Sequence, residues 1–353
     1  MRIMGILSFF LFLFSLLALL LNVANGQQIV PALFIFGDSV ADVGNNNHLS
    51  TLIKANFPPY GRDFVNHRPT GRFCNGKLAT DFTAEVLGFT SYPPAYLSGQ
   101  ARGRNLLIGA NFASASSGYY DATANLYHVI SLSKQLDNYR DYQKKLVGLA
   151  GASNTSSIIS DGIHFVSSGS SDFLQNYYIN PLLYRAYTPD QFSNRLMQSY
   201  SRFIQTLYGL GARKIGVTTL PPLGCLPAAI TLFGEGHNGC VSRLNHDATT
   251  FNRKLNATSQ NLQNRLSGLN LVVLDIYQPL HELVTRPSDH GFVEVRRGCC
   301  GTGLVETSIL CNPEALGTCA NASEYVFWDS FHPTEAANNY LSSQLQSAGL
   351  SLI

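Results

Sequence analysis

Short apolar runs alternate along the chain with longer stretches in which apolar positions recur at helical spacing. The short runs predict buried strands, because they are too short for helices and turn residues follow several of them. They cover residues 31–36, 106–110, 163–166, 214–218 and 269–276. The helical stretches cover residues 77–87, 132–149, 191–210, 244–266 and 334–346. Strands that alternate with helices predict an α/β fold with a parallel sheet and helices on both faces.

Polar residues follow the first three predicted strands. The first strand ends in Gly37-Asp38-Ser39, and the third ends in the polar stretch 167–172. Ligands of parallel sheets bind outside the carboxyl ends of the strands, so a site is expected there. The sequence shows no internal repeat and no linker, and one domain over residues 27–353 is therefore expected.

The first residues have the pattern of a secretory signal peptide. Met1 and Arg2 precede an uncharged apolar run over residues 3–21, and Ala24-Asn25-Gly26 places small residues where signal peptidase cleaves. We expect a signal peptide over residues 1–26 and a mature chain that begins at Gln27. An uncleaved signal anchor is the alternative, because the run approaches membrane-spanning length.

Composition narrows the function. The chain has 24 Lys and Arg against 22 Asp and Glu, so its net charge is +2 and neither nucleic acid nor an anionic membrane is an expected partner. Charged residues make up 13% and hydrophobic residues 45%, which argues against a disordered chain. No P-loop or H-E-x-x-H motif occurs in the sequence, and no cofactor or metal is expected.

Seven cysteines are unevenly distributed along the chain. Cys74 stands alone and is expected to be a buried free thiol. The other six are Cys225, Cys240, Cys299, Cys300, Cys311 and Cys319. In a secreted protein such a cluster predicts three disulfides. Cys225–Cys240 is the most local pair, and the adjacent Cys299 and Cys300 must each pair outward to Cys311 or Cys319. A zinc site is the alternative, although no C-x-x-C pair occurs.

Three N-x-[ST] sequons accompany the predicted signal peptide. They lie at Asn154, Asn256 and Asn321. Each is a candidate N-glycosylation site if the chain is secreted.

Three residues near the two ends of the chain are candidates for catalysis. Ser39 follows a buried strand and a glycine turn, a position that presents its hydroxyl in a cleft; the alternative is a serine that caps a helix. Asp329 precedes His332 by three residues, so its carboxylate can orient the imidazole as a base for a serine. The alternative is that Asp329 or Ser330 caps a helix.

Together these segments resemble the plant GDSL esterase/lipases of the SGNH hydrolase superfamily, and within them the anther-specific proline-rich-protein-like members. The first and last blocks are VPALFIFGDSVADVGNNN at 30–47 and DSFHPTEAAN at 329–338. Intermediate blocks in the same order are GRFCNGK (71–77), GANFASASSG (109–118), GSSDF (169–173), PPLGCLP (221–227) and GCCGTG (298–303). The resemblance implies a three-layer α/β/α, flavodoxin-like fold with a central parallel five-stranded sheet.

The resemblance also implies roles for single residues. Ser39 matches the nucleophile, and Asp329 and His332 match its acid and base partners. The oxyanion hole would combine the Ser39 N–H with a backbone N–H of the second block and a side chain of the third.

This chain departs from the family pattern at the oxyanion hole. Ser116 replaces a glycine of the second block and Gly118 is the next glycine retained, and both are candidate oxyanion-hole residues. We expect the Ser116 N–H to serve if its turn needs no positive φ. Ser171 replaces the family's asparagine, a loss on the order of 10²–10³ in rate if nothing compensates. Asp38 and Asp172 are expected to brace turns.

The leading interpretation is a secreted, extracellular serine esterase/lipase of the apoplast or cell wall. It would hydrolyse a small-molecule, lipid or cell-wall ester without a cofactor and without stable membrane insertion. The alternatives are a weak or inactive protein that binds such esters, and an acyltransferase that uses the same residues. The sequence indicates neither the natural ester nor an oligomeric state.

Overall fold

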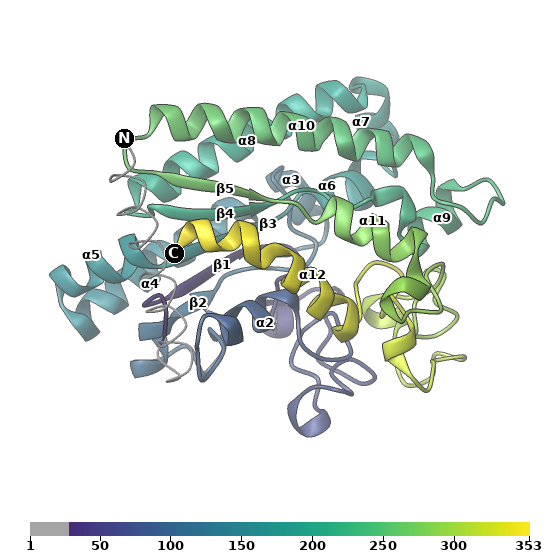
Figure 1. Ribbon diagram of the computed structural model, residues 1–353, viewed down its shortest axis with the longest axis horizontal. Helices are drawn as coiled ribbons and strands as arrows, with labels where there is room; N and C mark the ends of the chain where they lie inside the picture. The colour runs from purple at the N-terminus through teal and green to yellow at the C-terminus, as the bar shows by residue number, and fades with distance from the viewer. Residues whose placement is uncertain (1–27) are drawn as a thin grey trace, which may run out of the picture.

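Five parallel strands form one sheet in the computed structural model, which describes residues 28–353 (Figure 1). The strands are β1 (Leu33–Gly37), β2 (Gly109–Asn111), β3 (Ile163–Ser167), β4 (Lys214–Thr218) and β5 (Asn270–Leu274). Their order is β2-β1-β3-β4-β5, and all neighbours pair in parallel. The predicted parallel sheet is therefore confirmed. The predicted signal peptide lies outside the described residues.

Five helices occupy nearly the predicted positions. They are α2 (Ala79–Val86), α4 (Leu132–Ala150), α8 (Pro189–Gly209), α10 (Ser242–Arg265) and α12 (Glu335–Gly349). The pattern did not predict α3 (Asp121–Leu126), α5 (Ala152–Asp161), α6 (Ser170–Asp172), α7 (Pro181–Ala186), α9 (Pro227–Phe233) and α11 (Tyr277–Thr285). Most of these are short, and the described part of the chain also holds a π-helical turn at Phe173–Tyr177. Its 3₁₀ turns are Asn45–His48, Val65–His67, Gly103–Ile108, Leu223–Cys225, Pro287–His290, Ser308–Leu310, Ala322–Glu324 and Leu350–Leu352.

Helices cover both faces of the sheet, which gives three layers (Figure 1). Phe34 and Phe36 of β1 point into a core shared with α4, α8 and α10. Leu33 and Ile35, the alternate residues of β1, point to the opposite face and pack with Ala84 of α2. Because successive side chains of a strand point to opposite faces, a strand that is apolar throughout needs cover on both sides.

Threonine side chains cap the N-termini of α8 and α12. Thr188 accepts a hydrogen bond from the Gln191 N–H and caps α8, and Gln191 returns the bond in a capping box. Thr334 accepts from the Ala337 N–H and caps α12. The alternative in which Asp329 or Ser330 caps this helix is therefore wrong, and Asp329 is left for another role.

The second strand differs from its predicted range. Residues 106–108 belong to the 3₁₀ turn Gly103–Ile108, and β2 begins only at Gly109. Gly109 has a φ of 99°, and a Cβ there would meet the Leu33 carbonyl oxygen at 2.1 Å. The apolar pattern predicts burial correctly, but this glycine sets where the chain turns into the sheet.

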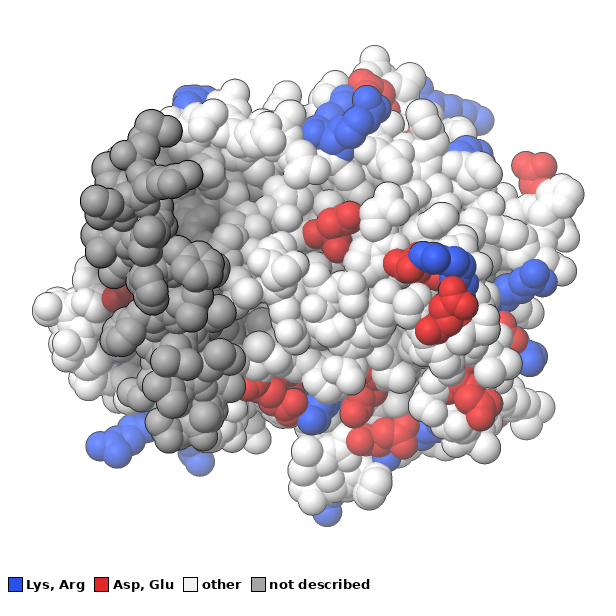
Figure 2. Space-filling view, in the orientation of Figure 1, with Lys and Arg blue, Asp and Glu red and all other residues white. Residues whose placement is uncertain are grey.

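Charged residues are sparse on the surface. Figure 2 shows that Lys, Arg, Asp and Glu are scattered on this face, with both signs intermixed among the described residues. Within residues 28–353, no helix has the length and apolar character that crossing a membrane requires.

Candidate active site

A tight turn at the end of β1 positions Ser39. Gly37 has a φ of 134°, and a Cβ there would lie 1.8 Å from the Ser167 carbonyl oxygen, so only glycine lets β1 approach β3 this closely. The Asp38 N–H donates to that oxygen at 3.0 Å. Ser39 follows in a turn, and no described helix begins there, so the helix-cap alternative is wrong.

Ser39, His332 and Asp329 lie in one chain of hydrogen bonds. The Ser39 Oγ is 2.6 Å from His332 Nε2, and His332 Nδ1 is 2.7 and 2.8 Å from the two Asp329 oxygens. An ionised carboxylate only accepts, so Nδ1 must carry the proton and Nε2 is left to accept from the serine. Asp329 is fully buried, and Ser39 and His332 are 8% and 5% exposed.

Asp329 has further donors that the sequence pattern did not indicate. The backbone N–H groups of Phe331 and His332 donate to its Oδ1, both at 2.9 Å. On the other side, the Tyr60 hydroxyl donates to Oδ2 at 2.8 Å and the Thr307 hydroxyl donates at 3.1 Å. These donors fix the carboxylate plane and compensate its burial.

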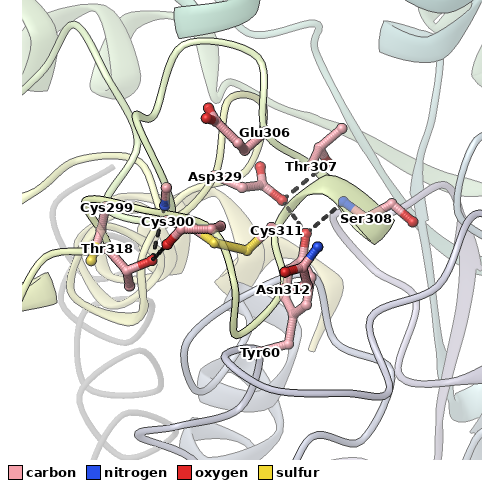
Figure 3. The surroundings of a disulfide bond; sticks show 12 residues. Tyr60, Cys299, Cys300, Glu306, Thr307, Ser308, Cys311, Asn312, Thr318 and Asp329 are labelled. Atoms are coloured by element: carbon pink, nitrogen blue, oxygen red, sulfur yellow. Dashed lines mark hydrogen bonds between the residues drawn. A yellow bond between two sulfur atoms is a disulfide. The ribbon is translucent and has the colours of Figure 1, made fainter.

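A loop closed by a disulfide supplies part of this support. Figure 3 shows Cys300 and Cys311 joined beside Asp329, with Thr307 and Ser308 on the loop between them. The Ser308 N–H donates to the Tyr60 hydroxyl at 2.7 Å, which orients that hydroxyl toward Asp329. The Cys300–Cys311 disulfide therefore closes the loop whose Thr307 and Ser308 help to hold the Asp329 carboxylate in place.

The structure pairs all six clustered cysteines. The disulfides are Cys225–Cys240, Cys299–Cys319 and Cys300–Cys311. Cys74 is free and buried, and burial raises the pKa of its thiol. No group of three or more His, Cys, Asp or Glu among residues 28–353 is arranged to hold a metal ion. The cluster serves as disulfides, and the zinc alternative is wrong.

A cavity with mostly apolar walls contains the Ser39 and His332 side chains. Ser171 also lines it, and its hydroxyl forms no hydrogen bond within the described chain. Phe165 and Leu345 are among the apolar lining residues. Apolar surroundings with a few convergent polar groups are typical of a site for a small, mostly apolar ligand.

The second block of the sequence differs from expectation. Ser116 has a φ of 63°, so the condition that its turn needs no positive φ is not met. A non-glycine residue held there costs on the order of 1–2 kcal/mol. In the described chain neither the Ser39 N–H nor the Ser116 N–H has a hydrogen-bond partner. At Gly118, a Cβ would lie 2.1 Å from the Asp172 carboxylate, so this glycine makes room for that side chain.

Two buried carboxyl groups flank the site. Asp172 accepts from the N–H groups of Tyr119 and Tyr120 and from the Thr123 hydroxyl, which braces the start of α3. Burial raises the pKa of Asp172 to about 7, although these bonds lower it. Burial likewise raises the pKa of Asp38 to about 7, and its carboxylate accepts from the Val40 N–H at 3.3 Å. Both side chains brace turns.

The raised pKa of Asp172 predicts how folding stability depends on pH. Its carboxyl titrates near 3.8 when unfolded and near 7 when folded. The contribution of the protonated Asp172 carboxyl to folding stability is therefore complete below pH 3.8. It is lost as the pH rises to 7, at about 1.4 kcal/mol for each pH unit. Asp172→Asn removes this dependence. We expect the stability of the variant relative to wild type to increase steadily from pH 4 to pH 7 in urea unfolding.

An exposed carboxylate supplies the control for this experiment. Asp161→Asn, at the exposed end of α5, is expected to follow the wild-type pH dependence. Changed hydrogen bonds at residue 172 shift the free energy of unfolding by the same amount at every pH. The test therefore compares how steeply the free energy of unfolding changes with pH. Parallel curves for wild type and Asp172→Asn would contradict the raised pKa.

The candidate glycosylation sites lie on the surface. Asn154, Asn256 and Asn321 are all exposed. Exposure is a requirement for glycosylation, which stays a prediction for each of them.

Comparison with known proteins places this geometry in a family. The sequence model of the GDSL-like lipase/acylhydrolases matches residues 33–345. One GDSL esterase/lipase of Arabidopsis thaliana is 68% identical over 334 residues, which cover 94% of this chain and 92% of that protein. A second is 64% identical over 334 residues, with 94% of each chain covered. The Arabidopsis GDSL esterase/lipase APG is 61% identical over 327 residues, which cover 92% of this chain and 93% of that protein.

Among solved structures, a Bacillus subtilis protein aligns over 91% of this chain and 56% of its own. Its TM-score of 0.34 and identity of 10% are too low to bear on the fold. The family match and the identities to plant relatives extend over nearly the whole described chain. The chain therefore belongs to the GDSL-like lipase/acylhydrolase family and is an ester-hydrolysing serine hydrolase.

Proposed function

We propose that the protein is a secreted esterase/lipase that hydrolyses carboxylic esters through an acyl-enzyme on Ser39. The observation that carries this proposal is the chain of hydrogen bonds from Ser39 through His332 to Asp329, inside a cavity with mostly apolar walls. A serine hydroxyl is a weak nucleophile and needs an oriented base. The 2.6 Å contact supplies that base at Nε2.

In the first half of the reaction, the Ser39 oxygen attacks the ester carbonyl carbon. Its proton moves to His332 Nε2, and the carbonyl π electrons move onto the oxygen to give a tetrahedral oxyanion. The imidazolium formed is stabilised by the buried Asp329 carboxylate at 2.7 Å. The intermediate then collapses, the carbon–oxygen bond to the alcohol breaks, and the alcohol leaves with the proton from Nε2.

In the second half, water takes the place of the alcohol. His332 Nε2 accepts a proton from the water as its oxygen attacks the acyl carbon. A second tetrahedral intermediate forms and releases the carboxylic acid as the proton returns to Ser39. No group outside the protein, the ester and water is needed for the balance.

Three groups are proposed as oxyanion donors. They are the backbone N–H groups of Ser39 and Ser116 and the Ser171 hydroxyl in the cavity. Ser116 adopts the positive φ that a glycine would have, so its turn is kept and its N–H, like that of Ser39, is free in the described chain. Pre-positioned donors stabilise the charge that develops in the transition state. Gly118 leaves room for Asp172, and we assign it no donor role.

Secretion is part of the proposal. The signal-peptide pattern at residues 1–26, three disulfides and three exposed sequons support a mature extracellular chain over residues 27–353. Disulfides form and persist in oxidising compartments. The assignment to the anther-specific proline-rich-protein-like subgroup rests on sequence resemblance and remains a proposal.

Hydrolysis of p-nitrophenyl acetate and butyrate by the secreted chain tests the function. Release of p-nitrophenol with free acid as the other product is the expected result. Product transferred to added glycerol instead of water would favour the acyltransferase alternative. A folded chain that binds esters but turns none over would contradict the proposal.

The Ser171 hydroxyl is predicted to contribute to turnover. Ser171→Ala removes one oxyanion donor, and kcat is expected to fall by about 10²-fold with little change in KM. Ser171→Asn, which restores the family's side chain, is expected to equal or exceed wild type. Steady-state kinetics on one ester measures both variants. An unchanged kcat in Ser171→Ala would remove Ser171 from the oxyanion hole.

A further inference from the structure

We propose that the slot between α12 and the sheet binds the acyl chain of the ester, and that Leu345 sets the length of the chain it accepts. This rests on the proposed function, because the slot matters only if Ser39 carries the acyl group. The inference names a substrate class: esters of unbranched, medium-length carboxylic acids.

The cavity that contains Ser39 and His332 extends along one helix. Helix α12 crosses the face of the sheet between α2 and α11 (Figure 1). Three of its residues line the cavity, namely Asn338, Leu341 and Leu345. They are three and four positions apart and therefore share one face of the helix. At 1.5 Å per residue, the row extends about 10 Å away from the His332 end.

The partly exposed ring of Phe165 forms the floor of the slot. Phe165 lies in the middle of β3, where it pairs with Ile35 and Gly216. Ile35 is buried, but Phe165 remains partly exposed although its strand is central. Gly216 has no side chain, and the Leu274 and Leu352 side chains lie 3.0 and 3.1 Å from the position that its Cβ would take. An apolar ring on a central strand is therefore left open to the slot.

The other walls are also mostly apolar. Ala79 of α2 lies on one side, and Ile276 and Leu280, at the start of α11, lie on the other. Of residues 28–353, no Lys, Arg or Glu lines this cavity, and Asp38 is the one acidic residue that does. Each methylene buried in such a slot gains about 0.8 kcal/mol, which is about fourfold in kcat/KM. A charged or strongly polar acyl group would lose its hydration without a partner.

The order of the reaction decides which half of the ester occupies the slot. The alcohol must leave to solvent, and water must then reach the same carbon. The acyl group stays bound to Ser39 through both steps. A narrow apolar slot beneath a helix suits the group that stays. The length of the row matches an extended octanoyl chain, whereas a palmitoyl chain would project beyond Leu345.

The test compares two substrate series on three variants. The acyl series is p-nitrophenyl acetate, butyrate, octanoate and palmitate, and the alcohol series is a set of acetate esters of increasing alcohol length. Leu345→Trp fills the far end of the slot. Gln344→Trp places the same side chain on the exposed face of α12 and is the matched control. Leu345→Ala lengthens the slot and covers the case in which the tryptophan variant does not fold.

Wild type is expected to prefer octanoate over acetate by on the order of 10³-fold in kcat/KM, because each of the six added methylenes contributes about fourfold. Leu345→Trp is expected to lower that preference at least tenfold while acetate hydrolysis stays within about twofold, and Leu345→Ala is expected to move the optimum to longer acyl chains. Gln344→Trp is expected to match wild type. An unchanged acyl profile in both Leu345 variants, or a change confined to the alcohol series, would overturn the slot assignment. Ser39-dependent acetate hydrolysis would still stand in that case, so failure of the slot and failure of the proposed function are distinguishable.

Discussion

Replacing Ser39 by Ala is expected to lower kcat for ester hydrolysis by about 10⁶-fold, because the acyl-enzyme can no longer form. Stability is expected to change by no more than about 1 kcal/mol. The Ser39 side chain forms one hydrogen bond, to His332, and alanine fits the same turn after Gly37. The measurement is kcat on p-nitrophenyl butyrate together with the urea unfolding midpoint of the same preparation.

A matched serine shows that the loss is specific to Ser39. Ser170 lines the same cavity, and we assign it no role in the reaction. Ser170→Ala is expected to keep kcat within about threefold of wild type. A Ser39→Ala protein that is folded and turns over at more than a hundredth of the wild-type rate would contradict the proposed nucleophile.

Asp329→Asn is expected to lower kcat by about 10⁴-fold at neutral pH through the tautomer of His332. The two backbone N–H groups that donate to Oδ1 cannot reverse, so the amide oxygen of the variant must stay there. The amide NH₂ then takes the Oδ2 position, where the hydroxyls of Tyr60 and Thr307 can rotate to accept. His332 Nδ1 then lies 2.7 Å from the amide oxygen and 2.8 Å from the position of the NH₂ group. When Nδ1 accepts from that NH₂, its proton moves to Nε2, which can no longer accept from Ser39. The imidazolium also loses the negative charge that stabilised it.

Tyr60→Phe tests how much the orientation of the Asp329 carboxylate matters when its charge is kept. It removes one donor to Asp329 but keeps the carboxylate and the packing of the ring against Phe73 and Trp328. We expect a loss of about tenfold in kcat, far smaller than for Asp329→Asn, with KM unchanged. The pair of variants is compared by steady-state kinetics at one pH. Equal losses in both, or no loss in Asp329→Asn, would contradict the role given to the carboxylate.

Local patterns were sufficient for most of the fold. The apolar runs at residues 163–166 and 214–218 correspond to β3 and β4, and the helical periodicity of residues 132–149 corresponds to α4. Propensity and periodicity are local properties, so they locate long amphipathic helices and buried strands. The start of β2 at Gly109 depends instead on the Leu33 carbonyl, which lies 76 positions away and leaves no local signal.

The sequence likewise indicates some residues of the candidate site and not others. Ser39, Asp329 and His332 belong to sequence blocks and could be proposed from them. Tyr60 contacts Asp329 across 269 positions of the chain, and a tyrosine alone indicates no such contact.

Two other features of the site do not follow from the sequence. The sequence does not decide whether Cys299 pairs with Cys311 or with Cys319, because its neighbour Cys300 could form either bond equally well. The structure pairs Cys299 with Cys319 and Cys300 with Cys311. The expected role of the Ser116 N–H depends on the φ angle of Ser116, and a sequence does not give a backbone angle.

Covalent labelling shows whether Ser39 is the nucleophile and His332 its base. The secreted chain is treated with a serine-directed alkyl phosphonate, digested and analysed by mass spectrometry. We expect one phosphonylated peptide, modified at Ser39, and labelling slowed at least a hundredfold in His332→Ala because the base is lost. A folded wild-type chain that stays unlabelled at Ser39, or that labels equally fast without His332, would contradict these roles.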